Sequence, residues 1–94
     1  MAFFVVNYTY RADVDLDSVR PQHREFLGNL VDSGLLRASG PLVDVDPPAA
    51  VLIFEAGSIE EVADTLDADP FNDADFIEDT LITEWNPVIG DFAE

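Results

Sequence analysis

The sequence predicts an α+β fold, a ferredoxin-like βαββαβ sandwich in which a four-stranded antiparallel sheet carries two helices on one face. Two observations lead to this prediction. The hydrophobic patterns follow one another in the order strand, helix, strand, strand, helix, strand. The chain has 94 residues, which suits a single domain over residues 1–94, and 48% of them are hydrophobic, far too many for a disordered acidic chain.

The first strand and the first helix are expected in the N-terminal third of the chain. Residues 2–10 are rich in β-branched and aromatic side chains, which is typical of a strand. The helix is expected to begin near Asp17 or Ser18, because either side chain can cap it, with Pro21 in its first turn. Gly34 suits the left-handed residue that ends a helix. The apolar residues of this helix follow helical spacing at Val19, Phe26, Leu27, Leu30 and Val31.

The central part of the chain predicts two further strands and a second helix. Residues 35–43 are extended, and residues 49–56 form a strongly apolar strand. Ser58 and Glu61 fit a capping box, in which each side chain bonds a backbone amide at the start of the helix. The second helix ends before Pro70, since the residue ahead of a proline is biased away from helical backbone.

A last strand and a tail complete the expected elements. Residues 72–75 are predicted to form a short polar connection, because Asn and Asp dominate them. Residues 76–85 alternate enough to serve as the fourth strand. Residues 90–94 are expected to be a loose tail, and no internal repeat or linker interrupts the order of the elements.

Both faces of the predicted sheet carry apolar side chains. An antiparallel sheet with one solvated face alternates apolar with polar residues, whereas the first and third strands here do not. A large exposed apolar face would favour aggregation, so we expect a second copy of the chain to cover it, giving a homodimer packed sheet against sheet. In the first strand, Phe3 and Val5 lie on one face and Phe4 and Val6 on the other. In the third strand, Val51 and Ile53 lie on one face and Leu52 and Phe54 on the other.

Acidic residues outnumber basic ones by 20 to 4, which gives a formal net charge of −16. Such a surface repels phosphate backbones and anionic lipid, so neither nucleic acid nor a membrane is expected as a partner. The acidity has two interpretations, a solvated coat suited to a high-salt cytoplasm or a field that attracts a cationic ligand. The basic residues are all arginines, at positions 11, 20, 24 and 37.

Several kinds of site are excluded by residues that the chain lacks. It has no cysteine and one histidine, which argues against a metal site, since zinc takes several nitrogen or sulfur ligands. No segment approaches the ~20 apolar residues of a membrane span, and the opening residues lack the basic region of a signal peptide. We therefore expect a soluble cytoplasmic protein that binds a small molecule and uses no cofactor.

The single histidine, His23, lies on the apolar face of the first predicted helix, close to its start. It is either a core histidine whose ring bonds a neighbouring group or a general acid or base in a pocket. The two helices of this fold run antiparallel on one face, so the start of the first lies near the end of the second. Asp67 or Asp69 is therefore placed to face His23 and to stabilise its imidazolium form.

Three further residues near this end of the fold are candidates for binding a substrate. Ser39 and Gly40, followed by Pro41, interrupt the second extended segment. They form either a bulge in the strand or a set of hydrogen-bond donors for an oxygen-bearing substrate. Arg20, one turn before His23, either anchors a carboxylate or balances the acidic surface.

Three segments in this order resemble the YCII-related domain family (YciI-like proteins): Val19-Arg20-Pro21-x-His23, Gly34-x-Leu36 leading into Ser39-Gly40-Pro41, and Asp67-Ala68-Asp69-Pro70-Phe71. The resemblance implies a fold of the dimeric α+β barrel type. It also implies that His23 and Asp69 are the suspected catalytic pair, which favours Asp69 over Asp67. The better-understood relatives are lyases or isomerases acting on small oxygenated, sometimes chlorinated, aromatic compounds.

Together these features favour a small cofactor-free enzyme. His23 would act as general acid or base in an elimination or isomerisation, oriented by Asp69, while Ser39 and nearby amides hold a developing oxyanion. The alternative is a non-catalytic module that binds or senses a small ligand in the same pocket. A third interpretation is a structural dimer in which His23 only satisfies the core.

Overall fold

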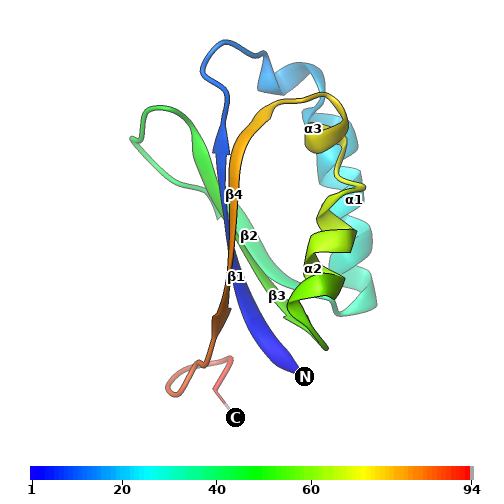
Figure 1. Ribbon diagram of the computed structural model, residues 1–94, viewed down its shortest axis with the longest axis vertical. Helices are drawn as coiled ribbons and strands as arrows, with labels where there is room; N and C mark the ends of the chain where they lie inside the picture. The colour runs from blue at the N-terminus through cyan, green and yellow to red at the C-terminus, as the bar shows by residue number, and fades with distance from the viewer. Residues whose placement is uncertain (94) are drawn as a thin grey trace.

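The computed structural model describes residues 1–93 as a four-stranded antiparallel sheet with every helix on one of its faces (Figure 1). The central strand β1 pairs with β3 on one side and β4 on the other, and β2 forms an edge beside β3. This arrangement confirms the predicted α+β fold with βαββαβ order. The strands are β1 (Ala2–Tyr10), β2 (Leu36–Pro41), β3 (Ala49–Ala56) and β4 (Ile77–Trp85).

The first helix, α1 (Arg20–Ser33), begins later than the sequence predicts. A 3-10 turn, η1 (Leu16–Ser18), precedes it, and no side chain caps its first turn. The predicted cap at Asp17 or Ser18 is therefore wrong, because the Ser18 hydroxyl donates instead to the Asp15 carbonyl at 2.6 Å and stabilises the 3-10 turn. The helix ends as predicted, at Gly34 with a left-handed φ of 86°.

The second helix, α2 (Ile59–Leu66), carries the predicted capping box. The Glu61 amide donates to the Ser58 hydroxyl oxygen at 3.1 Å, and the Glu61 carboxylate accepts from the Gly57 amide at 2.8 Å. The predicted polar connection is wrong in part, since Pro70–Asp73 form a short helix, α3. Its cause is the Asp69-Pro70 pair, in which an aspartate caps the turn that a proline begins.

The core lies between the sheet and the helices. Alternate residues of β1 and β3 point toward the helix layer and are buried, which is the period-2 pattern of a half-covered sheet. Each large apolar side chain so buried contributes about 1.5–3 kcal/mol to folding. Buried residues of the core from the sheet and α2 include Phe4, Val6, Tyr8, Leu36, Leu52, Phe54, Val62 and Leu66.

The opposite face of the sheet is covered in part by the C-terminal segment. Phe92 packs on Phe3 with ring centroids 5.6 Å apart, and Trp85 meets both rings edge-on. Phe3 is consequently only 5% exposed although it points away from the helices. The predicted loose tail at 90–94 is therefore wrong for Phe92, which gains burial against Phe3, whereas Glu94 lies outside the described residues.

Most of this open face remains accessible in the single chain. Val5, Val51 and Ile53 are half-buried, and Leu81 is 57% exposed. The homodimer expected from the apolar pattern stays a prediction, and this face would form its interface. No helix within residues 1–93 has the length and apolar character needed to cross a membrane.

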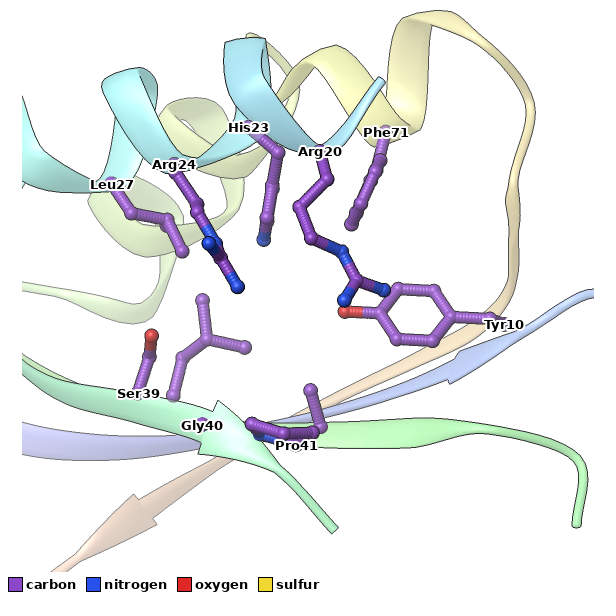
Figure 2. A pocket seen from close by; sticks show the side chains of 11 residues that line it. Tyr10, Arg20, His23, Arg24, Leu27, Ser39, Gly40, Pro41 and Phe71 are labelled. Atoms are coloured by element: carbon purple, nitrogen blue, oxygen red, sulfur yellow. The ribbon is translucent and has the colours of Figure 1, made fainter. Parts of the chain in front are cut away.

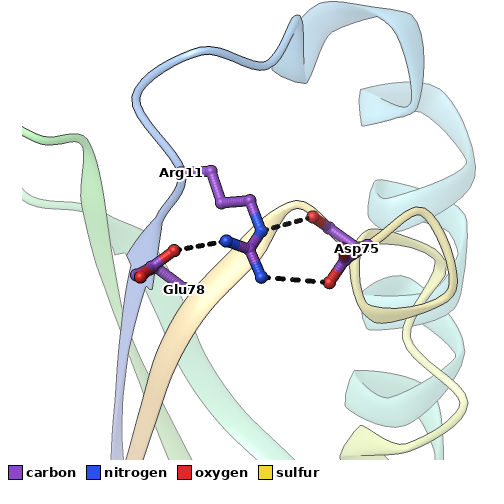
Figure 3. Close-up of polar contacts among 3 residues, drawn as sticks. All are labelled: Arg11, Asp75 and Glu78. Carbon is purple, nitrogen blue, oxygen red and sulfur yellow. Dashed lines mark hydrogen bonds and ion pairs between the residues drawn. The ribbon is translucent and has the colours of Figure 1, made fainter.

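Arg11, just after β1, ties the end of that strand to the chain between α3 and β4 (Figure 3). Its guanidinium bonds the Asp75 carbonyl at 2.9 Å and the Asp75 carboxylate at 3.2 Å, and it also pairs with Glu78. The Arg11 amide donates to the Phe76 carbonyl at 2.8 Å. These bonds hold α3 beside the sheet, at the end of the molecule where α1 begins.

Candidate functional site

His23 and Asp69 form a buried pair where the start of α1 meets α3. The Nδ1 atom of His23 lies 2.7 Å from Oδ1 of Asp69, and the two residues are 9% and 0% exposed. The predicted proximity of the first helix to the end of the second is confirmed. Asp67, the other carboxylate that spacing allowed, lies exposed on the surface.

Three donors surround the Asp69 carboxylate. Besides His23, the Tyr8 hydroxyl donates to Oδ2 at 3.0 Å, and the Phe71 amide donates to Oδ1 at 2.9 Å. A buried charge is tolerated only when hydrogen bonds replace its lost water, and here both oxygens have partners. The bond from Phe71 is also the cap of α3, so one carboxylate both starts that helix and orients the histidine.

The surroundings of His23 fix its ring in one orientation. An ionised Asp69 can only accept, which places the hydrogen of the neutral imidazole on Nδ1 and leaves a lone pair on Nε2. The Phe71 ring stacks on the imidazole with centroids 4.0 Å apart and planes 15° from parallel. Figure 2 shows the ring directed from α1 toward β2, with its free nitrogen at the tip.

That nitrogen faces a cavity of about 270 Å³ between the start of α1 and the β2–β3 edge of the sheet (Figure 2). Its volume is just below the ~300–1,000 Å³ of pockets for drug-sized ligands, and it combines apolar walls with a few polar groups. The polar side chains lining it are Tyr10, Arg20, His23, Arg24 and Ser39. The apolar ones are Leu27, Pro41, Ala50, Leu52 and Phe71.

The structure brings all three expected substrate-binding candidates to this cavity. Ser39 pairs with the buried Leu52 in the sheet, so it lies on the face toward the helices, and Gly40 follows it along the cavity wall. Arg20 also lines the cavity while its Nε atom lies 3.4 Å from Asp17. The predicted bulge at Ser39-Gly40-Pro41 is misplaced, because the register of β2 shifts earlier, between Leu36 and Ala38.

Sequence reasoning missed several residues of the site. Arg24 lines the cavity and follows Arg20 by four positions, so the helical period placed both on one face. Tyr8 and Tyr10 share the inward face of β1 with its buried apolar residues, which the alternation of the strand also indicated. Nothing in the sequence indicated that Phe71 would stack on His23.

The two tyrosines stay protonated near neutral pH. Burial raises the pKa of the Tyr8 hydroxyl far above its ordinary value, and the neighbouring Asp69 charge adds to this effect. Burial, helped by the Asp69 charge, likewise raises the pKa of Tyr10 to about 12, against an opposing effect of Arg20. Tyr8 is therefore a permanent hydrogen-bond donor to Asp69.

The described residues offer a histidine, a carboxylate and polar contacts rather than a metal centre. In the part of the chain from Met1 to Ala93, no three or more His, Cys, Asp or Glu side chains are grouped so that they could hold a metal ion. The arrangement suits proton transfer at Nε2 of His23, since the Asp69 carboxylate stabilises the imidazolium that would form.

Solved structures with the same fold include two that cover nearly all of this chain. The protein At3g17210 from Arabidopsis thaliana has a TM-score of 0.56 and 13% identity, and the match covers 98% of this chain and all of that one. The protein Atu4242 from Agrobacterium tumefaciens has a TM-score of 0.53 and 18% identity, over 99% and 97% of the two chains. Both likenesses support the expected fold of the dimeric α+β barrel type.

A third solved structure is more similar. The 5-chloro-2-hydroxyhydroquinone dehydrochlorinase TftG from Burkholderia phenoliruptrix AC1100 has a TM-score of 0.79 and 22% identity, over 89% of this chain and 93% of that one. No curated protein sequence matches the chain. The model of the YCII-related domain matches residues 1–86. That match spans nearly the whole sequence, and the chain therefore belongs to the YCII-related domain family.

Proposed function

We propose that this protein is a small cofactor-free enzyme that uses the His23–Asp69 dyad for general acid–base chemistry on a small oxygenated aromatic metabolite. The observation that carries the proposal is the free Nε2 of His23 at the cavity, with Asp69 buried behind it and 2.7 Å from Nδ1. A structural histidine needs a partner for its ring, but it does not need an open cavity at the other nitrogen.

In the proposed reaction, Nε2 of His23 removes a proton from the substrate, and Asp69 stabilises the resulting imidazolium. In an elimination, the electron pair of the broken bond forms a new double bond, and a leaving group departs with its own bonding pair. In an isomerisation, the imidazolium returns the proton to a different substrate atom. Ser39 and Arg20 line the cavity, and in this proposal they hold the oxygen on which negative charge develops. Positioned proton transfer of this kind accelerates reactions by roughly 10²–10⁴-fold.

The similar fold of TftG supplies the first substrate class to test. That protein is a dehydrochlorinase of 5-chloro-2-hydroxyhydroquinone, and its structure holds 2,5-dihydroxybenzoquinone. Loss of a proton and a chloride ion from such a chlorinated ring needs no oxidant, because the hydroquinone becomes a quinone as hydrogen chloride leaves. The cavity of about 270 Å³ suits a single ring of this kind.

The experiment measures chloride release from chlorinated hydroxyhydroquinones under anaerobic conditions. The wild type is compared with His23→Gln and Asp69→Asn, and the exposed Asp67→Asn serves as a control with the same chemical change. We expect His23→Gln to lose roughly 10²-fold or more in rate, Asp69→Asn to lose less, and the control to lose nothing. Full turnover by folded His23→Gln would contradict the proposal. Binding without turnover by the wild type would instead favour the ligand-binding module.

A further inference from the structure

Three of the four arginines are held by carboxylates of this chain. Arg11 pairs with Asp75 and Glu78, Arg20 with Asp17, and Arg37 with Glu55. Arg24 is the exception, since within residues 1–93 it has neither an ion pair nor a side-chain hydrogen bond. Among the described residues, the one arginine without a carboxylate partner lines the cavity at His23.

The charged side chains that line the cavity are basic. The net charge of the chain is −16, yet no acidic residue lines the cavity, while two of the four arginines do. Figure 2 shows Arg24 running from α1 toward β2 beside the His23 ring, so its guanidinium is directed into the cavity. A guanidinium presents several donors in a plane that matches the two oxygens of a carboxylate or neighbouring ring oxygens.

The carboxylate that bonds the cavity histidine does not pair with Arg24. Asp69 lies behind the imidazole, and its two oxygens accept hydrogen bonds from three donors, on Tyr8, His23 and the Phe71 backbone. Asp17 forms an ion pair with Arg20. Arg24 is therefore an exposed cation at the cavity, and no carboxylate within residues 1–93 pairs with it.

We propose that the cavity binds a single-ring organic acid as its anion, with the anionic oxygen on the Arg24 guanidinium and the ring against the apolar walls. Leu27, Leu52 and Phe71 supply those walls, and a volume of about 270 Å³ suits a ligand with one ring. The inference rests on the proposed function, because it names the substrate class of the same site. It adds that the ligand is already ionised when it binds and that Arg24, rather than His23, selects for the charge.

Two probes of equal shape test this inference without any turnover. Benzoate carries the anionic oxygens, and benzamide is its neutral counterpart. Binding is followed by NMR through the chemical shifts of the single histidine side chain, which lies in the cavity. We expect benzoate to bind at least ~10-fold more tightly than benzamide, and Arg24→Gln to remove that difference while leaving benzamide unchanged. Arg24→Lys should restore part of it, because the charge returns without the planar fork.

Arg37→Gln is the matched control, since it changes the net charge equally but lies near Phe3 and Phe92, away from the cavity. Equal binding of benzoate and benzamide to the wild type would overturn the inference, and so would an Arg24→Gln variant that keeps the preference. Arg24-dependent binding of benzoate in a protein that turns over no substrate would uphold the inference and refute the enzyme. Turnover that is equally efficient in Arg24→Gln would uphold the enzyme and refute the inference about Arg24.

Discussion

The Nδ1 atom of His23 lies 2.7 Å from Oδ1 of Asp69, although 46 positions separate the two residues in the chain. One belongs to the first turn of α1, and the other caps α3. The contact exists only when both helices are seated on the sheet. The dyad therefore forms only in the folded chain.

We predict that neutral His23 carries its hydrogen on Nδ1. The Asp69 carboxylate accepts at that nitrogen, so the usual mixture of the two imidazole tautomers should collapse to one. Long-range ¹H–¹⁵N correlation spectra are unambiguous here, since the chain has one histidine. Asp69→Ala should restore the mixture, and Asp67→Ala should not alter the spectrum. A wild-type ring protonated on Nε2 would contradict the prediction.

Tyr8→Phe should destabilise the protein by about 1–3 kcal/mol, because it leaves the buried Oδ2 of Asp69 without a donor. Urea unfolding monitored by circular dichroism measures the change, with the slope of the transition unaltered. Tyr10→Phe provides a matched control, since its hydroxyl lines the cavity and it should cost less. Equal losses in the two variants would mean that the bond from Tyr8 to Asp69 contributes little.

Stability should fall as the pH rises above 10. Both tyrosines have a folded-state pKa above the unfolded value of 10.0, and that of Tyr10 is about 12. Below pH 10 neither state ionises and the contribution is fully present. Above pH 10 the unfolded chain loses phenol protons that the folded chain keeps, so stability is lost as the pH approaches and passes 12. Phenolate absorbance should therefore appear together with unfolding. Phenolate in a chain with a native circular dichroism spectrum at pH 10 would refute this.

Salt should raise the melting temperature. The exposed face of α2 places Asp64 one turn from Glu60, Glu61 and Asp67, and like charges at this spacing repel. Molar salt shortens the screening length to ~3 Å and removes most of that repulsion. Thermal unfolding from low to molar salt measures the effect, and Asp64→Asn should weaken it. A melting temperature that is independent of salt would argue against self-repulsion.

The open face of the sheet should pair two copies of the chain. Leu81 is 57% exposed there, beside the half-buried Val5, Val51 and Ile53. Leu81→Glu should convert a dimer into a monomer in analytical ultracentrifugation, because a buried unpaired carboxylate is strongly unfavourable. Val31→Glu, at a residue of α1 that is 52% exposed, should leave the dimer intact. A wild type that sediments as a monomer at micromolar concentration would exclude the pairing.

Much of the fold could be predicted from local patterns. Strands β1 and β3 are rich in apolar and β-branched residues, and α2 begins with the Ser58–Glu61 capping pattern, so their positions follow from side chains close together in sequence. The predicted topology then indicated that His23 lies near Asp67 and Asp69, but it did not show which of the two bonds the ring. The choice depends on Asp69 capping α3, a helix of only four residues that is too short to give a periodic signal.

What the sequence could not reveal are contacts between distant side chains. Phe92 covers Phe3 because the segment after β4 packs its ring against that residue of β1, a pairing that neither residue's neighbours indicate. The start of α1 was misplaced because a 3-10 turn at Leu16–Ser18 uses the expected capping residue for its own bond. The helical period indicated that Arg24 shares a face of α1 with Arg20, but its lack of a carboxylate partner within residues 1–93 follows only from the positions of the side chains.

The His23–Asp69 pair and the wall of the cavity opposite to it depend on the fold to different degrees. Asp69 is bonded from β1, α1 and α3 at once, so a change there disturbs stability as well as chemistry. Ser39 to Pro41 lie on β2, an edge strand that pairs with β3 alone. Residues along this border of the sheet can therefore be exchanged at less cost to the fold than the residues that surround Asp69.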